Sequence, residues 1–398
     1  MFVLTAHNHR RAFIALILGV AAVFTAAAQP DGEMLRRLLA QPAEQAIATL
    51  DSLPPEQSLE YAFLLVQSAL EEGNQPRAQQ VMNAAEHIAR NTGDAAILAE
   101  VRSTQAFLAQ ARNDIAEAME IMAEVVQLTE TAGLTDELIN ALIFLGGLQH
   151  RYGMLGGALA TTQRVLAREG EIQNQRTIAR MHSEAAMLNY KLGNHDDVVP
   201  YLDRALPIFQ ELNDENGIGT VYRIYGNYHI AFDRVETALD YYHRARELYV
   251  STGNVHDYAN ISFNIGLIFL QANNPAVALP HLQNAVENFV AARSTSGAGM
   301  AGTELGRALF QLNRYSEAEQ VMAQARRHLE SSQSFRRLAQ AHAMYGAIRF
   351  TMGDRDPALE AYSNALRLYR HLGMSRDEQR IVETMIRIRE GTQGRIEL

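Results

Sequence analysis

The sequence predicts an all-α solenoid, a stack of helix pairs, and three observations support this fold class. A signature of small, large and turn-forming residues recurs every 40 residues, eight times in succession, along the 398-residue chain. Self-similarity at a period of about 20–50 residues is typical of stacked repeat arrays. Small residues within each unit recur at helical spacing. The content of 47% hydrophobic and 7% aromatic residues, with only 10 prolines and no tryptophan, also suits an all-helical protein.

Each unit opens on a small anchor residue, which lies on the first helix of the predicted pair. The anchors are Val66, Ala106, Gly146, Ala186, Gly226, Gly266, Gly306 and Gly346. Small residues also stand 12 and 19 positions after the anchor, as Ala238 and Ala245 do in unit five. The residue 16 positions after the anchor is usually large, and the set is Met82, Met122, Thr162, Leu202, Tyr242, Leu282, Met322 and Tyr362. These last three positions are four and three residues apart and share one face of the second helix, so we expect the two helices to approach closely there.

Turn formers separate the helices of each pair. Seven positions after the anchors stand Gly73, Asn113, Gly153, Gly193, Asp233, Asn273, Asn313 and Gly353. Glycine, asparagine and aspartate tolerate the left-handed conformation that ends a helix. A second stop is expected 27 positions after the anchor, where units three, six and seven depart from the rule with Gln173, Arg293 and Gln333. Pro200, Pro207 and Pro280 are expected inside helices, which they should kink.

The sequence divides into four parts: a signal peptide at residues 1–28, an N-terminal capping hairpin at 29–55, eight repeats at 56–375, and a C-terminal capping helix with a tail at 376–398. Arg10 and Arg11 precede an apolar stretch, and alanines precede the expected cleavage after Ala28. This order is typical of a secretory signal. An uncleaved membrane anchor is the alternative. The arginine pair also leaves open twin-arginine rather than general secretory export.

Charge and motif content argue against several classes of function. The formal net charge is −10, and removal of residues 1–28 makes it −12, so the basic footprint of a nucleic-acid-binding protein is missing. The chain has no cysteine and 13 histidines, none in a metalloprotease-like spacing. Residues 296–302 read S-G-A-G-M-A-G, but we expect this segment to open a helix and not to follow a strand, as a dinucleotide site requires. We therefore expect no catalysis, no cofactor, no metal and no nucleic-acid partner.

The repeat resembles the tetratricopeptide repeat family. Two segments carry the resemblance, namely Tyr225-Gly226 with Ala238, Tyr242 and Ala245, and Tyr345-Gly346 with Gly353, Ala358, Tyr362 and Ala365. The unit of 40 residues is similar to the subclass of this family with a 40-residue period. The N-terminal segment makes the chain similar to secreted bacterial members of the family. The resemblance implies a right-handed superhelical solenoid whose first helices line a concave groove.

Places that face the groove are implied by the same resemblance, and polar residues gather there in units four to seven. The candidate partner-binding residues are Arg180, Arg223, Asn227, Asn260, Asn264 and Arg307. Asparagine can pair with both the N–H and the C=O of an extended peptide, and arginine offers a planar fork to a carboxylate. Arg223, Asn227 and Asn264 resemble part of a carboxylate clamp, but Met300 and Glu304 occupy its other basic places. The apolar residues Phe263, Leu267, Leu270, Phe310 and Phe350 fit either a partner-binding role or the core.

Two classes of function fit these observations. The first is a non-catalytic, exported, periplasmic scaffold that binds a peptide or a partner protein in a concave groove. The alternative is an extracytoplasmic, ligand-responsive sensor or regulator of a membrane signalling protein. After the repeats, the sequence has no apolar stretch that could span a membrane and no output domain, which favours the first class. The partner, the pathway and the oligomeric state are left open.

Overall fold

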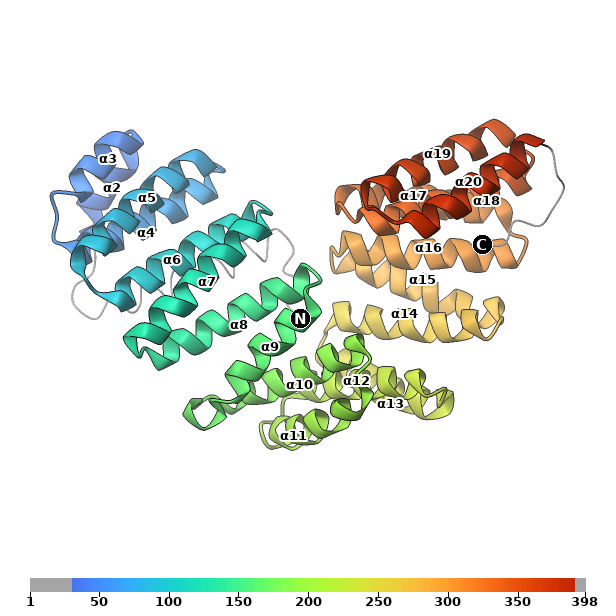
Figure 1. Ribbon diagram of the computed structural model, residues 1–398, viewed down its shortest axis with the longest axis horizontal. Coiled ribbons are helices and arrows are strands. Elements are labelled where there is room, and N and C mark those ends of the chain that lie inside the picture. Colours follow the sequence, from blue (N-terminus) through green and yellow to red (C-terminus); the bar gives the residue numbers. More distant parts are fainter. Residues whose placement is uncertain (1–30, 391–398) are drawn as a thin grey trace. The chain divides into compact units, whose positions relative to one another are not determined.

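A computed structural model describes residues 31–390 of the chain, and these residues are all-helical (Figure 1). They form 19 α-helices and no strand, which confirms the predicted all-α fold. The predicted signal at residues 1–28 and the tail after residue 390 lie outside the described part. None of the described helices combines the length and the apolar character needed to cross a membrane.

The helices of residues 55–371 alternate as first and second members of eight pairs (Figure 1). The pairs are α4 (Pro55–Glu71) with α5 (Gln75–Thr92), α6 (Ala95–Ala111) with α7 (Ile115–Ala132), α8 (Thr135–Arg151) with α9 (Leu155–Leu166), α10 (Gln175–Leu192) with α11 (Val198–Glu211), α12 (Glu215–Ala231) with α13 (Val235–Ser251), α14 (Val255–Gln271) with α15 (Pro275–Ala291), α16 (Thr295–Gln311) with α17 (Tyr315–Ser331), and α18 (Phe335–Thr351) with α19 (Arg355–His371). Two 3-10 turns, Glu169–Glu171 and His195–Asp197, follow α9 and precede α11.

The chain divides within α11, after Ile208, into two compact units. In the N-terminal unit, the hairpin of α2 (Gly32–Ala40) and α3 (Ala43–Leu50) packs on α4 and α5. Its Leu38 and Leu50 are fully buried. Arg77 of α5 donates hydrogen bonds to the carbonyls of Leu38 and Leu39, at 3.3 and 3.2 Å, and so satisfies carbonyls that the end of α2 leaves unpaired.

In the C-terminal unit, each of the helices from α12 to α20 packs mainly on its neighbours in sequence. First helices also contact first helices, α14 with α16 and α16 with α18. The capping helix α20 (Ser375–Glu390) covers α19 with Ile381, Met385 and Ile388. Ile386, although apolar, is 47% exposed. Its position on the helix lies about 100° from that of Met385, so it faces away from the buried stripe.

The predicted turns are confirmed residue by residue. All eight turn formers, from Gly73 to Gly353, have positive φ angles, between 52° and 91°. At the second stop, Arg293 (φ 54°) and Gln333 (φ 52°) adopt the same left-handed conformation, although neither residue type favours it. Two departures from the even pattern remain. The second helix of unit three, α9, ends early at Leu166, and Gln173 has no left-handed turn. Pro200 is the third residue of α11, where the missing N–H costs no helical hydrogen bond, whereas Pro207 and Pro280 do lie inside helices.

The small anchors allow the close contact between the two helices of a pair. A Cβ atom added at Gly266 would lie 2.7 Å from Leu282, one at Gly306 2.5 Å from Met322, and one at Gly346 2.9 Å from Tyr362. Each neighbour is the large residue 16 positions later. Unit three differs, because a Cβ at Gly146 would meet Thr161 at an ordinary 3.5 Å. The contact that organises the repeat is therefore the large side chain of the second helix against the backbone of the first.

Two matched substitutions test this contact. Gly226→Ala should lower the free energy of unfolding by about 1–3 kcal/mol, because overpacking against the buried Tyr242 strains the pair. Gly146→Ala should raise it by about 0.5–1 kcal/mol, because alanine favours the helix and space is available. Urea unfolding followed by circular dichroism measures both values. A loss of stability in both variants would contradict the packing described here.

Candidate functional site

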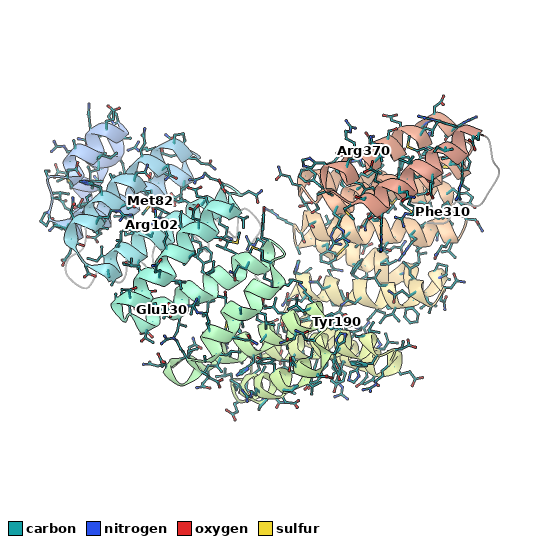
Figure 2. All side chains as sticks on the ribbon, viewed as in Figure 1. Met82, Arg102, Glu130, Tyr190, Phe310 and Arg370 are labelled. Atoms are coloured by element: carbon teal, nitrogen blue, oxygen red, sulfur yellow. The ribbon has the colours of Figure 1, made fainter. Side chains whose placement is uncertain are left out.

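Five of the six predicted partner-binding residues lie on first helices of the C-terminal unit. Arg223 and Asn227 belong to α12, Asn260 and Asn264 to α14, and Arg307 to α16. Arg180 belongs to α10 of the N-terminal unit and is exposed. It lies on the same helix as Tyr190, which Figure 2 labels and whose pKa burial raises. Arg180 is therefore in a different compact unit from the other five candidates.

Asn227 and Asn264 are in direct contact, and a tyrosine joins them. The Asn264 Nδ2 donates to Asn227 Oδ1 at 3.2 Å, and the Tyr242 hydroxyl donates to the same oxygen at 2.7 Å. Tyr242 is the large packing residue of its repeat and is 2% exposed. We call Asn227, Tyr242 and Asn264 the asparagine cluster. Because Tyr242 is held by the core, it fixes the orientation of the Asn227 amide.

Arg223 lies one helical turn before Asn227, beside a second buried tyrosine. Burial alone would lower the pKa of this guanidinium, but Tyr249, in hydrogen-bonding contact, and the Asp257 carboxylate raise it overall. Burial likewise raises the pKa of Tyr249 to about 12 despite the nearby arginine. The Nε atom of Arg223 is buried and has no hydrogen-bond partner in residues 31–390. Arg223 therefore stays charged. Tyr249 and Asp257 are its neighbours, and they leave its Nε–H without a hydrogen bond in the described chain.

Asp257 links Arg223 to the start of α14. Its carboxylate accepts hydrogen bonds from Asn254 Nδ2 at 3.0 Å and from Asn260 Nδ2 at 3.3 Å. Asn260 Nδ2 also donates to the His256 carbonyl at 3.2 Å. Asn260 is thereby tied to the first turn of its own helix, which fixes its side-chain direction.

Three amide groups of these asparagines have no hydrogen-bond partner among the described residues. They are Asn227 Nδ2, a donor, and Asn260 Oδ1 and Asn264 Oδ1, which are acceptors. All three residues are half-buried, and the other atom of each amide group forms hydrogen bonds that set the orientation of the side chain. None of the three unpaired atoms is fully buried, so each is accessible to solvent. Donors and acceptors held on neighbouring helices can pair with the backbone of an extended chain.

Arg307 has an acidic neighbour on its own helix. Its Nη2 lies 2.5 Å from Glu304 Oε2, one turn earlier on α16. Burial raises the pKa of Glu304, and Arg307 and Arg337 partly offset this. The glutamate that occupies a clamp position thus pairs with the arginine beside it, which reduces the net charge that this turn of α16 offers to a carboxylate.

The apolar candidates belong mostly to the core. Phe263 and Leu270 are 7% and 5% exposed, and Leu267 and Phe310 pack on the same cluster. Phe310, labelled in Figure 2, has its ring centroid 5.5 Å from that of Tyr315. Phe350 packs against the last core cluster. The sequence left open whether these residues bind a partner or belong to the core, and their burial favours the core.

The glycine-rich segment 296–302 lies within α16, as the sequence predicted. A Cβ at Gly299 would lie 2.5 Å from Leu329, and one at Gly302 2.9 Å from the Ala325 Cβ. These glycines therefore allow α16 to pack closely on α17. Within residues 31–390, no group of three or more histidine, aspartate or glutamate side chains is placed to hold a metal ion.

The sequence did not lead us to predict Tyr242, Tyr249 and Asp257 as members of the site. Tyr242 was interpreted only as a packing residue. A signal was available, because most of the large residues at this repeat position are apolar, and a buried tyrosine hydroxyl usually needs a partner. Asn227, 15 residues earlier, supplies it.

Comparisons with known proteins agree with this fold. The family model described as Tetratricopeptide repeat matches residues 177–249 and 217–289. These ranges include α12 to α14 and hence the asparagine cluster. Together with the helix pairs, the matches show that the chain is a tetratricopeptide repeat protein. A comparison with curated proteins finds no match.

Solved structures match over most of the chain. Yeast Tom70 has 13% identity and a TM-score of 0.55, covering 96% of this chain and 80% of that one. A Rap protein complexed with competence and sporulation factor has 12% identity and a TM-score of 0.54, covering 88% and 99%. A signal transduction ATPase with a tetratricopeptide repeat sensor, from Pyrococcus horikoshii, has 13% identity and a TM-score of 0.52, covering 96% and 67%. At these identities the likeness shows the fold alone.

Two buried tyrosines test how far the cluster contributes to folding. Tyr242 and Tyr362 occupy equivalent repeat positions and are both 2% exposed, but only the Tyr362 hydroxyl lacks a partner in the described chain. Tyr242→Phe should lower the free energy of unfolding by about 0.5–1.5 kcal/mol, the net worth of one hydrogen bond. Tyr362→Phe should leave it unchanged or raise it by about 1 kcal/mol, since an unsatisfied buried hydroxyl is removed. Denaturant titration measures both, and equal losses would contradict this assignment.

Proposed function

We propose that this protein is a non-catalytic interaction scaffold that holds an extended segment of a partner protein on the first-helix face of α12 and α14. The repeat fold itself supports a protein–protein interaction scaffold. The observation that carries the finer proposal is the set of oriented, unpaired amide groups of Asn227, Asn260 and Asn264.

The chemistry of these groups suits a peptide backbone. Asn227 Nδ2 would donate to a backbone carbonyl, and Asn264 Oδ1 would accept from a backbone N–H. Tyr242 holds the Asn227 amide in place before binding, so little side-chain entropy is lost on association. Arg223, charged and half-buried, would meet an acidic side chain or a terminal carboxylate. Because Arg307 is paired with Glu304, we assign Arg307 at most a minor role.

The sensor function remains the second candidate. Two of the similar structures motivate it, since one Rap protein is complexed with competence and sporulation factor, and the P. horikoshii protein is described as having a repeat sensor. In that case the same face would bind a signalling peptide, and the repeats would transmit the effect of binding to a membrane signalling protein. Identification of the bound molecule separates the two, because a scaffold would copurify with a structural or assembly partner and a sensor with a small peptide.

We also propose that the protein is exported and acts in the periplasm. The order of Arg10 and Arg11, an apolar stretch and Ala26 to Ala28 supports this location.

The location predicts cleavage after Ala28. Mass spectrometry of the intact protein, recovered from the periplasmic fraction of cells that express the full chain, should give the mass of a chain that begins at Gln29. The full-length mass in the inner-membrane fraction would instead indicate an uncleaved anchor.

The binding site predicts the effect of two substitutions. Wild-type protein is used to capture the partner, which is identified by mass spectrometry and titrated by calorimetry. The double variant Arg223→Ala, Asn264→Ala should weaken binding by about 2–4 kcal/mol if the two effects add, because it removes one charged and one neutral hydrogen bond. Asn288→Ala is the matched control. Asn288 lies on the second helix α15, and its Nδ2 donates to the Asn284 carbonyl.

Thermal unfolding of each variant separates a binding defect from a folding defect. The proposal requires that the double variant stays folded at the titration temperature and loses affinity, while Asn288→Ala binds as the wild type does. Unchanged affinity of the double variant would place the binding site elsewhere on the chain.

A further inference from the structure

A cavity of about 430 Å³ lies among α17, α18 and α19 of the C-terminal unit, on helices that carry none of the residues of the proposed peptide site. Its wall is formed by Arg326, Glu330, Leu338, His342, Asn364, Arg367 and Leu368. Two arginines and a histidine thus face one space with a single acidic residue, and two leucines supply an apolar side.

The two arginines differ in burial, since Arg326 is half-buried and Arg367 is exposed. Arg326 has its guanidinium carbon 4.5 Å from the centroid of the Tyr345 ring, and its Nε is buried without a hydrogen bond. Arg367 donates to Asn364 Oδ1, a neutral group. Neither guanidinium forms an ion pair with a carboxylate of residues 31–390. Arginine in such a setting keeps its charge and most of its donors available.

His342 is the most buried polar residue of the cavity, at 6% exposure. Its Nδ1 has no hydrogen-bond partner in the described chain. Burial, followed by the charges of Arg326 and Arg367, lowers the pKa of His342 to about 4. The ring is therefore neutral at pH 7 and lies in a positive electrostatic potential.

A second buried histidine shows what is missing here. His182, at 1% exposure in the N-terminal unit, has its Nε2 3.0 Å from the Glu169 carboxylate. That histidine receives an anionic partner from its own chain. In the cavity of α17 to α19 the charged neighbours of His342 are two cations, Arg326 and Arg367, and no carboxylate of residues 31–390 pairs with it. The Nδ1 atoms of both histidines lack a hydrogen-bond partner in this part of the chain, so the difference lies in the charge around the ring.

We propose that this cavity binds a small organic carboxylate, with Arg326 and Arg367 as its charge partners, an N–H of His342 as a further donor, and Leu338 and Leu368 against its alkyl part. Arg326, Arg367 and Glu330 together leave one positive charge on the wall. That balance favours a singly charged carboxylate over a doubly charged phosphate. The short apolar wall favours a ligand with a few carbon atoms beside the carboxylate.

The experiment follows the histidine rings of the full chain by proton–nitrogen NMR over a pH series, with butyrate, inorganic phosphate or chloride added at equal ionic strength. The His342 signal is the one lost in His342→Gln. Butyrate should raise the His342 pKa and leave the exposed histidines unchanged, because a bound anion stabilises the imidazolium. Phosphate should have a smaller effect, and chloride none.

Arginine variants give a test that does not depend on His342→Gln folding. Arg326→Gln and Arg367→Gln should each weaken butyrate binding by about tenfold or more, the loss expected for one charged hydrogen bond. Arg327→Gln, on an exposed neighbour of Arg326 in α17, should bind as the wild type does. No response of His342 to either anion, or full binding in both cavity variants, would overturn the site. Stronger binding of phosphate than of butyrate would overturn the assignment to a carboxylate.

Discussion

The close contact between the two helices of each pair is the constraint on which the rest of this structure depends. In units five to eight the large side chain of the second helix lies against the backbone of the first, at Gly226, Gly266, Gly306 and Gly346. No Cβ atom fits there without displacement of a neighbour. The short distance buries the alanines of the second helix completely, as at Ala238 and Ala245. Each pair can then stack on the next through buried apolar faces, which is how a repeat array gains stability.

This contact also organises the proposed binding face. Tyr242 fills the space beside Gly226 and at the same time donates its hydroxyl to Asn227. A residue of the core thus sets the direction of a polar group that reaches solvent. Tyr362 fills the same position in unit eight, where Ala347 stands in place of the asparagine, and its hydroxyl has no partner in the described chain. One repeat position therefore supports a polar site in one unit and only packing in another.

Unpaired buried polar atoms occur at both places where we propose ligands, and also at residues outside them, such as His182 and Arg349. Such atoms cost free energy unless something satisfies them. On α12 the buried Nε of Arg223 belongs to a residue one turn from Asn227, and the buried Nδ1 of His342 and Nε of Arg326 belong to residues that line the cavity among α17 to α19. The first set combines neutral amides with one cation and suits a peptide backbone. The second combines two cations with an apolar wall and suits a small carboxylate.

The repeat, the helix pairs and all eight turns between paired helices could be predicted from the amino-acid sequence, because residue size and backbone preference act locally and recur at a fixed spacing. The sequence also indicated that Arg223, Asn227, Asn260 and Asn264 belong to one face. Three findings needed the folded structure. Phe263 and Leu270 are core residues, Glu304 pairs with Arg307, and Tyr242, Tyr249 and Asp257 contact the predicted polar residues. The folded structure alone brought Arg326, His342 and Arg367 around one cavity. Burial and charge pairing depend on which side chains of neighbouring helices meet, and a one-dimensional spacing does not contain that information.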